Sequence, residues 1–276
     1  MELLLLGSGG VIPPPKPGCD CKVCIEARTK GIPFRRSGCA LFVKDADLLF
    51  DCPEDIREEL NRENIKSVRN IILTHWHPDH TQGLRIMETL NWDFINHKPF
   101  FEPINVFISK EQHDLFKKFS CGGFLDFYEK RGSIKINYFE PGKTLKLDKI
   151  TIRPVLIEKT RGFYFEISDG NKKAVYAPCE YYKVVIDKQT KNVDAFIVHH
   201  LYFENKKLGF FSLADEEDSF ETMLEHAKQM KAKRIIITHI EEVYQLGHTE
   251  LQKALKKTYP AYPLEVGFDG MRIKLE

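Results

Sequence analysis

The sequence has almost no imbalance of charge. Its 41 lysines and arginines are matched by 40 aspartates and glutamates, which leaves a net charge of +1. A general nucleic-acid binder presents an excess of positive charge to the phosphate backbone. The balance therefore argues against nucleic acid as a partner, and it weakens a nuclease function without excluding it.

A long hydrophobic run is also missing. The apolar stretch Leu3–Leu6 is short, follows Glu2 in place of a basic residue, and leads into the glycine-rich segment Gly7–Gly10, so it does not resemble a secretory signal. We expect it to form the first buried strand. No other run is long enough to span a bilayer. We therefore expect a soluble, cytoplasmic protein without a membrane partner, and we leave open whether it forms a homodimer.

Cysteine is scarce and unevenly distributed. The total of seven is odd, which argues against a framework of disulfides. Three of the seven, Cys19, Cys21 and Cys24, form a C-x-C-x-x-C cluster. Thiolates at this spacing suit one closed structural zinc site that needs a fourth ligand. The alternative is three incidental thiols.

One short stretch is instead crowded with metal-binding side chains. It follows the apolar run Val68–Leu73 and contains four candidate ligands, His75, His77, Asp79 and His80. Imidazole and carboxylate are standard zinc ligands, and burying so many of them without a partner would be costly. A loop leaving a strand can aim His75 and His77 at one ion and the other two at a second ion. The alternative is an ordinary polar loop.

The pattern H-x-H-x-D-H in this stretch resembles the signature of the metallo-β-lactamase superfamily. The resemblance implies an α/β fold, a four-layer αβ/βα sandwich with the metals at one edge of two packed sheets. It does not fix the substrate, because the superfamily contains lactamases, thioester hydrolases, nucleases, phosphodiesterases and redox proteins. We expect a single domain over residues 1–276, with a zinc-binding insertion at about 13–36.

Two further segments narrow the resemblance to one group within the superfamily. Gly18–Cys24 near the start and Glu265–Met271 near the end look like those of the phosphoribosyl cyclic phosphodiesterase group of phosphonate breakdown. In that group the three cysteines and a histidine near the end of the chain hold a structural zinc. Here the resemblance points to His248, with Glu242 as an alternative oxygen ligand.

The superfamily pattern also implies site residues elsewhere in the chain. His239 follows a buried strand and would complete the second metal position. Asp51 matches an acidic residue that orients the metal loop by holding the other ring nitrogen of a ligating histidine. Where the superfamily has a further histidine for the first position, only Glu158 could coordinate, and a carboxylate shifts the preference towards harder ions.

The residue that bridges the two ions is also altered. This position is usually an aspartate, and here it falls on Cys179, with Glu180 beside it. A bridging thiolate would be softer and more easily oxidised; the alternative is a buried thiol in a protein that binds one metal or none. Of the tandem pair His199 and His200, only one can enter the site. We favour His200 as the proton donor to the leaving oxygen.

These residues predict a metal-dependent hydrolase, and the resemblance implies a phosphodiesterase acting on a small cyclic phosphate ester through a metal-bound hydroxide. Two active-site divalent metals are expected, which could be zinc, manganese or iron. The expected ligands are His75, His77 and Glu158 for one ion, Asp79, His80 and His239 for the other, and Cys179 or Glu180 between them. Asp79 and His200 are the predicted catalytic residues. Alternatives are another hydrolase, such as a nuclease or an esterase, and a non-catalytic ligand- or metal-binding protein with a degenerate site.

The substrate-binding residues are not predicted. Arg35 and Arg36 could contact an anionic substrate, or they could belong to a solvated loop. Residues 92–142 are rich in phenylalanine and lysine, and could line a substrate pocket or simply pack as core or lid.

Three local predictions concern structure outside the site. Residues 215–231 read as the clearest helix, with acidic residues at the start and basic residues at the end. Residues 264–275 read as a closing hairpin that turns at Asp269 and Gly270. His97 and His113 stand among polar and charged residues, which predicts ordinary surface histidines.

Overall fold

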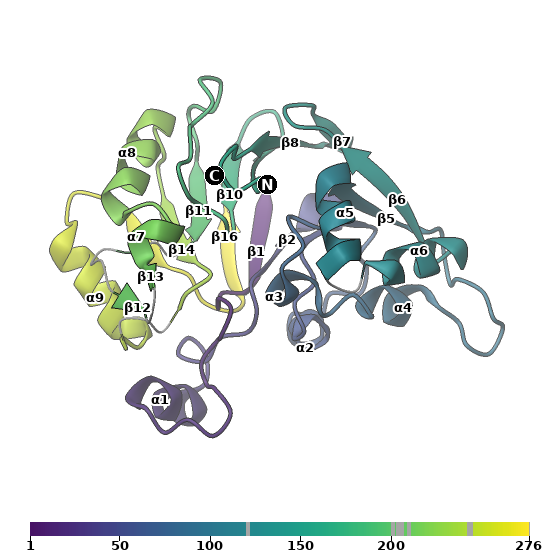
Figure 1. The fold of residues 1–276 in the computed structure, drawn as a ribbon, viewed down its shortest axis with the longest axis horizontal. Helices are drawn as coiled ribbons and strands as arrows, with labels where there is room; N and C mark the ends of the chain where they lie inside the picture. Colours follow the sequence, from purple (N-terminus) through teal and green to yellow (C-terminus); the bar gives the residue numbers. More distant parts are fainter. Residues whose placement is uncertain (120–121, 200–201, 203–206, 209–210, 242–244, 276) are drawn as a thin grey trace.

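The computed structural model describes residues 1–119, 122–199, 202, 207–208, 211–241 and 245–275. Two seven-stranded mixed sheets pack against each other between two sets of helices (Figure 1). This is the predicted four-layer αβ/βα sandwich. None of the described helices is long and apolar enough to cross a membrane.

The first sheet has the strand order β16-β1-β2-β3-β4-β5-β6. Its strands are β1 Glu2–Gly7, β2 Ala40–Val43, β3 Leu48–Phe50, β4 Asn70–Ile72, β5 Ile104–Ser109, β6 Ile134–Phe139 and β16 Met271–Lys274. Its helices are α2 Ile56–Arg62, α3 Pro78–Thr81, α4 Ile86–Asn91, α5 Lys110–Phe119 and α6 Gly123–Lys130, with the short 3-10 helix η1 at Lys44–Ala46.

The second sheet has the strand order β15-β14-β11-β10-β9-β8-β7. Its strands are β7 Leu145–Leu147, β8 Ile150–Leu156, β9 Phe163–Ser168, β10 Lys173–Ala177, β11 Ala195–His199, β14 Ile235–Thr238 and β15 Leu264–Val266. Its helices are α7 Leu213–Glu216, α8 Phe220–Met230 and α9 His248–Thr258, and a small separate sheet joins β12 Lys207–Leu208 to β13 Phe211–Ser212.

Strands buried on both faces explain the unbroken apolar runs of the sequence. In β1, Leu3 and Leu5 enter the core between the two sheets, whereas Leu4 and Leu6 enter the core beneath the helices of the first sheet. Successive side chains of a strand point to opposite faces. The leucine run therefore supplies two separate cores, as a buried first strand requires.

The segment between β1 and β2 leaves the sandwich and contains α1 Lys22–Lys30, which lies at the bottom of Figure 1. The three clustered cysteines belong to this excursion. The ion pair between Lys22 and Glu250 links the start of α1 to the start of α9. The excursion is therefore tied to the helical layer of the second sheet.

The predicted closing hairpin is wrong. β15 pairs in parallel with β14 in the second sheet, whereas β16 pairs antiparallel with β1 in the first sheet. Gly270 has a φ of 83°, so the Asp-Gly turn signal is real. However, the turn carries the chain from one sheet to the other. Local pattern cannot distinguish these two outcomes, because each strand alternates in the same way.

The predicted helix over 215–231 is two helices, α7 and α8. Ser219 separates them, because its Oγ accepts a hydrogen bond from the backbone N–H of Thr222 at 3.2 Å and so caps the start of α8.

The prediction for His97 is confirmed, since it is exposed, but the prediction for His113 is wrong. His113 is fully buried in α5, and its Nδ1 lies 2.9 Å from the hydroxyl of Tyr138.

Candidate metal centre

The candidate ligands gather where parallel strands of both sheets end. β3 and β4 run in parallel in the first sheet, and β10, β11 and β14 run in parallel in the second. The loop after β4 carries His75 and His77, the turn after β10 carries Cys179 and Glu180, and His239 directly follows β14. Carboxyl ends of parallel strands lie at one edge of a sheet. The site therefore lies across the seam between the two sheets.

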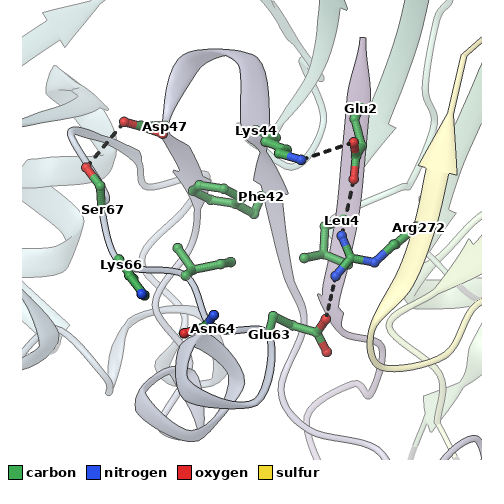
Figure 2. A pocket seen from close by; sticks show the side chains of 11 residues that line it. Glu2, Leu4, Phe42, Lys44, Asp47, Glu63, Asn64, Lys66, Ser67 and Arg272 are labelled. Carbon is green, nitrogen blue, oxygen red and sulfur yellow. Dashed lines mark hydrogen bonds and ion pairs between the residues drawn. The ribbon is translucent and has the colours of Figure 1, made fainter.

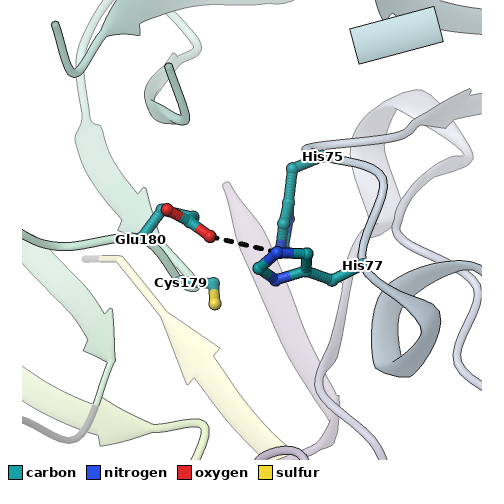
Figure 3. A group of neighbouring side chains, drawn as sticks. All are labelled: His75, His77, Cys179 and Glu180. Atoms are coloured by element: carbon teal, nitrogen blue, oxygen red, sulfur yellow. Dashed lines mark ion pairs between the residues drawn. The ribbon is translucent and has the colours of Figure 1, made fainter. Parts of the chain in front are cut away.

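The first group comprises His75, His77, Cys179 and Glu180, whose ligand atoms all lie within 4.8 Å of one another. Figure 3 shows both imidazoles facing the thiol and the carboxylate across the seam. His77 Nε2 lies 3.3 Å from a carboxylate oxygen of Glu180. His75 Nε2 is buried without a hydrogen-bond partner among the described residues. An orphaned, buried imidazole nitrogen beside a thiol and a carboxylate fits a metal ligand.

The second group comprises His80, Cys179 and His239, again within 4.8 Å of one another. The Nε2 atoms of His80 and His239 are 3.2 Å apart. Asp79 Oδ2 lies 3.3 Å from the first of these nitrogens and 3.2 Å from the second. The structure thus brings together all the residues predicted for the second position. It also places Cys179 in both groups, as expected of a residue between two ions.

Asp51 controls the orientation of two of the histidines. Its fully buried carboxylate accepts a hydrogen bond from the backbone N–H of Thr74 at 2.8 Å and another from the Thr74 hydroxyl at 2.8 Å. His80 Nδ1 is 2.7 Å from the same carboxylate. Because the Thr74 hydroxyl donates to Asp51, it can accept from His75 Nδ1 at 2.9 Å. Both histidines then carry the proton on Nδ1 and leave Nε2 free to coordinate a metal.

Mutual electrostatics hold the acidic ligands in the forms that bind metal. Burial alone would raise the pKa of Cys179, but the charges of His239 and His75 hold that pKa well below its usual value. Burial would likewise raise the pKa of Asp79, yet hydrogen bonds from His239 and His80 lower it. Burial would lower the pKa of His80, but Asp51 raises it well above its usual value, so a cation that binds His80 must displace the proton from Nε2. A thiolate and a carboxylate in one histidine cluster are the ionisation states that bind a divalent cation.

Three site residues have left-handed backbone conformations. The φ angles are 65° at Asp51, 59° at Glu180 and 50° at His239. Residues other than glycine adopt this region at a cost of about 1–3 kcal/mol, and such residues concentrate at functional sites. The bends after the strands therefore turn these side chains into the seam. No pattern in the sequence predicted these bends.

The second sheet adds a histidine–glutamate pair beside the second group. The rings of His199 and His239 have centroids 4.5 Å apart, and His199 Nε2 lies 3.6 Å from a carboxylate oxygen of Glu217. Burial raises the pKa of Glu217 to about 7, although His199 and His239 oppose this. The sequence reasoning missed Glu217, which it counted among the acidic residues at a helix start. The favoured proton donor, His200, lies outside the described residues.

The prediction that Glu158 completes the first position is wrong. Its side chain is 83% exposed and pairs with Arg161 at 3.3 Å. The backbone N–H of Ile157 bonds to the carbonyl of Gly162 at 2.9 Å, which turns the chain back after β8 and directs residue 158 to solvent. Glu180 supplies the carboxylate in its place.

The cysteine cluster forms as predicted in part. The ligand atoms of Cys19, Cys21 and Cys24 lie within 4.8 Å of one another, and the described residues add no fourth ligand at that distance. His248 is the first residue of α9, where its Nδ1 lies 3.3 Å from a guanidinium nitrogen of Arg36 instead. The alternative ligand Glu242 lies outside the described residues. The structural zinc and its fourth ligand therefore stay predictions.

Arg36 is not available to a substrate. Its buried guanidinium donates to the Ser8 hydroxyl and to the carbonyl of Gly267, both at 2.7 Å. It therefore holds the first sheet to the crossing that leads into β16.

A separate groove lies on the first sheet, and its lining includes residues that precede the metal loop in the sequence. Figure 2 shows it between β1, β2 and the segment after α2, and its volume is about 410 Å³. Its charged groups pair with each other, as in Arg272 with Glu2 at 3.2 Å and with Glu63 at 3.4 Å. It contains none of the predicted ligands.

Solved structures share this fold over the whole chain. A diphosphatase from the PhnP family has a TM-score of 0.75 at 21% identity, covering 99% of this chain and 96% of that one. Zinc-bound PqqB from Methylobacterium extorquens has a TM-score of 0.72 at 16% identity, and the short form of human tRNase Z a TM-score of 0.64 at 15% identity; each alignment covers 100% of both chains. At these identities the likeness shows the fold alone.

A curated octanoyltransferase from Porphyromonas gingivalis matches a shorter part of the sequence. It is 36% identical over 94 residues, which are 33% of this chain and 19% of that protein. The match therefore spans about a fifth of that protein's length.

A family model settles the relationship. The model described as the beta-lactamase superfamily domain matches residues 47–240. This range contains Asp51, the metal loop, Cys179 and His239, and it begins after the cysteine cluster. Because the match covers more than half of the sequence and the two-sheet sandwich agrees with it, the chain belongs to the β-lactamase superfamily.

Proposed function

We propose that this protein is a metal-dependent phosphodiesterase that hydrolyses small phosphate esters, cyclic phosphates included. The observation that carries the proposal is the pair of ligand groups that share Cys179. The similarity to a diphosphatase and to tRNase Z supports chemistry at phosphorus. Two adjacent cation positions suit such chemistry, because charge develops on both the attacking and the leaving oxygen.

The residues divide into two ligand sets. His75, His77 and Glu180 would hold one ion, Asp79, His80 and His239 would hold the other, and Cys179 would contact both. Two divalent ions bound here, whether zinc, manganese or iron, would supply charge neutralisation and lower the pKa of water.

The chain's own residues prepare the site. Asp51 fixes the tautomers of His75 and His80, so the ligand nitrogens need no rearrangement when substrate arrives. We assign proton delivery to His199, because its Nε2 faces Glu217 and its ring adjoins the second group. A carboxyl group with a pKa of about 7 can return a proton to this imidazole near neutral pH.

The test combines metal analysis with an assay. Purified protein is analysed for metal content and then assayed on bis-p-nitrophenyl phosphate and on cyclic ribose phosphates, with added manganese or zinc. We expect turnover, and we expect His75→Ala to lower kcat/KM at least about 100-fold, since even partners behind a ligand are worth 10–100-fold.

Glu158→Ala is the matched control, because its carboxylate is exposed and should leave activity unchanged. Absence of turnover with every metal, together with zinc that is lost only in Cys21→Ser, would show a non-catalytic metal-binding protein.

A second candidate is an acyl ester or thioester hydrolase. The observation in its favour is the 36% identity with an octanoyltransferase over 94 residues. Including p-nitrophenyl octanoate in the same assay separates the two candidates. A higher kcat/KM on the octanoate than on every phosphodiester would replace the first proposal with this one.

A further inference from the structure

An aromatic surface adjoins the first ligand group. Trp76 stands between two candidate ligands in sequence, and its ring centroid is 4.8 Å from that of His77, with the planes at 80°. The ring of Trp76 also lies 5.2 Å from the ring of Phe119, at 38°. The three rings form a continuous path from the metal centre to the end of α5.

Trp76 packs against the core beneath the helices of the first sheet, but the aromatic surface extends beyond that core. The side chain of Phe119 is 55% exposed, and Trp76 is half-buried. By contrast, Phe116 on the preceding turn of α5 is fully buried. A single exposed aromatic residue is common, but exposed aromatic rings that adjoin a polar centre mark a binding surface.

The surface is held in place from below. The backbone N–H of Trp76 donates to the side-chain carbonyl of Gln112 at 3.2 Å, and the amide of that buried glutamine donates to the carbonyl of Arg161 at 2.9 Å. Gln112 and Phe119 are seven residues apart, so they share one face of α5. The same face of the helix thus supports Trp76 and presents Phe119. A surface fixed in advance costs little entropy when a ligand binds.

The chemistry of this surface selects a class of ligand. An aromatic platform stacks a planar ring, and the stacking of a nucleobase on an aromatic side chain is worth about 1–3 kcal/mol. Lys118 Nζ lies 4.8 Å from the centroid of Phe119, which adds a cation beside the platform. In a nucleotide, one ribose separates base and phosphate, so a base on Trp76 leaves the phosphodiester beside His77. We propose that Trp76 and Phe119 bind the base of a nucleotide substrate, an assignment that rests on the phosphodiesterase function proposed above.

Binding can be measured without turnover, because the chain has only two tryptophans. The second, Trp92, is covered by the guanidinium of Arg131 at 3.6 Å from its ring, and its indole nitrogen is buried. In Trp92→Phe, fluorescence therefore reports Trp76 alone. We expect AMP to quench this emission saturably. Ribose 5-phosphate, which has the phosphate but no base, should bind about 5–150-fold more weakly and should not quench. Equal affinity for the two ligands, or no quenching by AMP, would overturn the proposal.

Kinetics give a second, independent test. Phe119→Ala should raise the KM for 2′,3′-cyclic AMP by about 5-fold or more and leave the KM for a cyclic ribose phosphate unchanged. Phe127→Ala, which removes a 53% exposed phenylalanine on α6, should change neither value. An equal rise for both substrates in Phe119→Ala would refute base recognition. Turnover of neither substrate by the wild type would refute the phosphodiesterase function instead, while the fluorescence result would still decide whether Trp76 binds a base.

Discussion

At the scale of single residues, Asp51 is the group outside the ligand sets that orients two of the candidate ligands. One carboxylate receives His80 directly and His75 through Thr74, so a single buried charge sets two ligand nitrogens. Residues in this position are expected to matter almost as much as the ligands themselves.

The first prediction replaces this carboxylate. Asp51→Asn keeps the size but offers one acceptor oxygen where two are used, so metal affinity and kcat/KM should each fall about 10–100-fold. Elemental analysis and steady-state kinetics measure both. Asp47→Asn is the control, since Asp47 also has a left-handed φ, of 42°, but pairs on the surface with Arg69. Wild-type metal content in Asp51→Asn would contradict the orienting role.

The second prediction concerns the shared sulfur. Cys179→Asp installs the aspartate usual in the superfamily, and an oxygen ligand favours harder ions than a thiolate does. We expect the variant to retain two active-site metals and to shift its preference from zinc towards manganese, as measured by competition between the two ions. An unchanged preference would mean that Cys179 does not contact the metals.

The third prediction uses the ionisation of Glu217. A carboxyl group whose pKa is raised to about 7 in the folded protein stabilises the fold fully below its unfolded value of about 4.5. That contribution is lost as the pH rises towards 7. Glu217→Gln should therefore gain free energy of unfolding relative to wild type between pH 5 and pH 8. The gain is at most about 3 kcal/mol, since a tenfold change in proton affinity is worth 1.36 kcal/mol.

Urea denaturation at the two pH values measures this difference. Glu216→Gln alters the exposed neighbour and should show no such pH dependence. A constant difference between Glu217→Gln and wild type across this range would contradict the raised pKa.

At this scale, the sequence predicted the site best where its residues are close together along the chain. The candidate ligands of the loop with His75 and His80 could be grouped from the sequence, because they are close in sequence. Glu158 was misassigned, because a turn after β8 determines where it points. Glu217 was missed altogether, since its importance comes only from burial beside His199.

At the scale of elements, strands were predictable where both faces are buried. β1 and β14 are nearly continuous apolar runs and appear where expected. The wrong predictions concerned how strands pair with one another. The sequence of β15 and β16 looks like a hairpin, but the two strands belong to different sheets. Which sheet a short strand joins depends on contacts across the whole chain, such as the hydrogen bond from Gly270 N–H to the carbonyl of Leu5 at 2.8 Å.

The fourth prediction tests that crossing. Buried Asp269 accepts hydrogen bonds from the backbone N–H of Ser8 at 3.0 Å, from the Ser8 hydroxyl at 2.8 Å and from the backbone N–H of Ser37 at 2.7 Å. Asp269→Ala should lower the free energy of unfolding by about 3–5 kcal/mol, because the buried Arg36 also loses the favourable charge interaction with Asp269. Asp114→Ala, at an exposed ion pair with Lys110, should cost less than about 1 kcal/mol. Similar losses in the two variants, by urea denaturation, would refute the crossing's role.

At the scale of the whole molecule, the candidate metal ligands come from both halves of the sandwich. The first sheet delivers the metal loop, whereas the second sheet delivers Cys179 and His239. Ions held between them would resist separation of the sheets, in the way that any ligand specific to the folded state adds stability.

The fifth prediction follows from that bridging. Saturating the active-site positions at about 100 times Kd should add about 2.7 kcal/mol and raise Tm by about 5–10 °C for each ion bound. Calorimetry with and without a chelator measures the shift. It should shrink in His75→Ala and persist in part in Cys21→Ser. A shift lost only in Cys21→Ser would place the stabilising metal in the cysteine cluster alone.

The position of Cys179 has one further consequence. Its sulfur belongs to both ligand groups, whereas each histidine belongs to only one. A chemical change at that single atom withdraws a ligand from both positions at once, while the loss of a histidine affects one. The two candidate positions therefore share one point of failure, which is this sulfur.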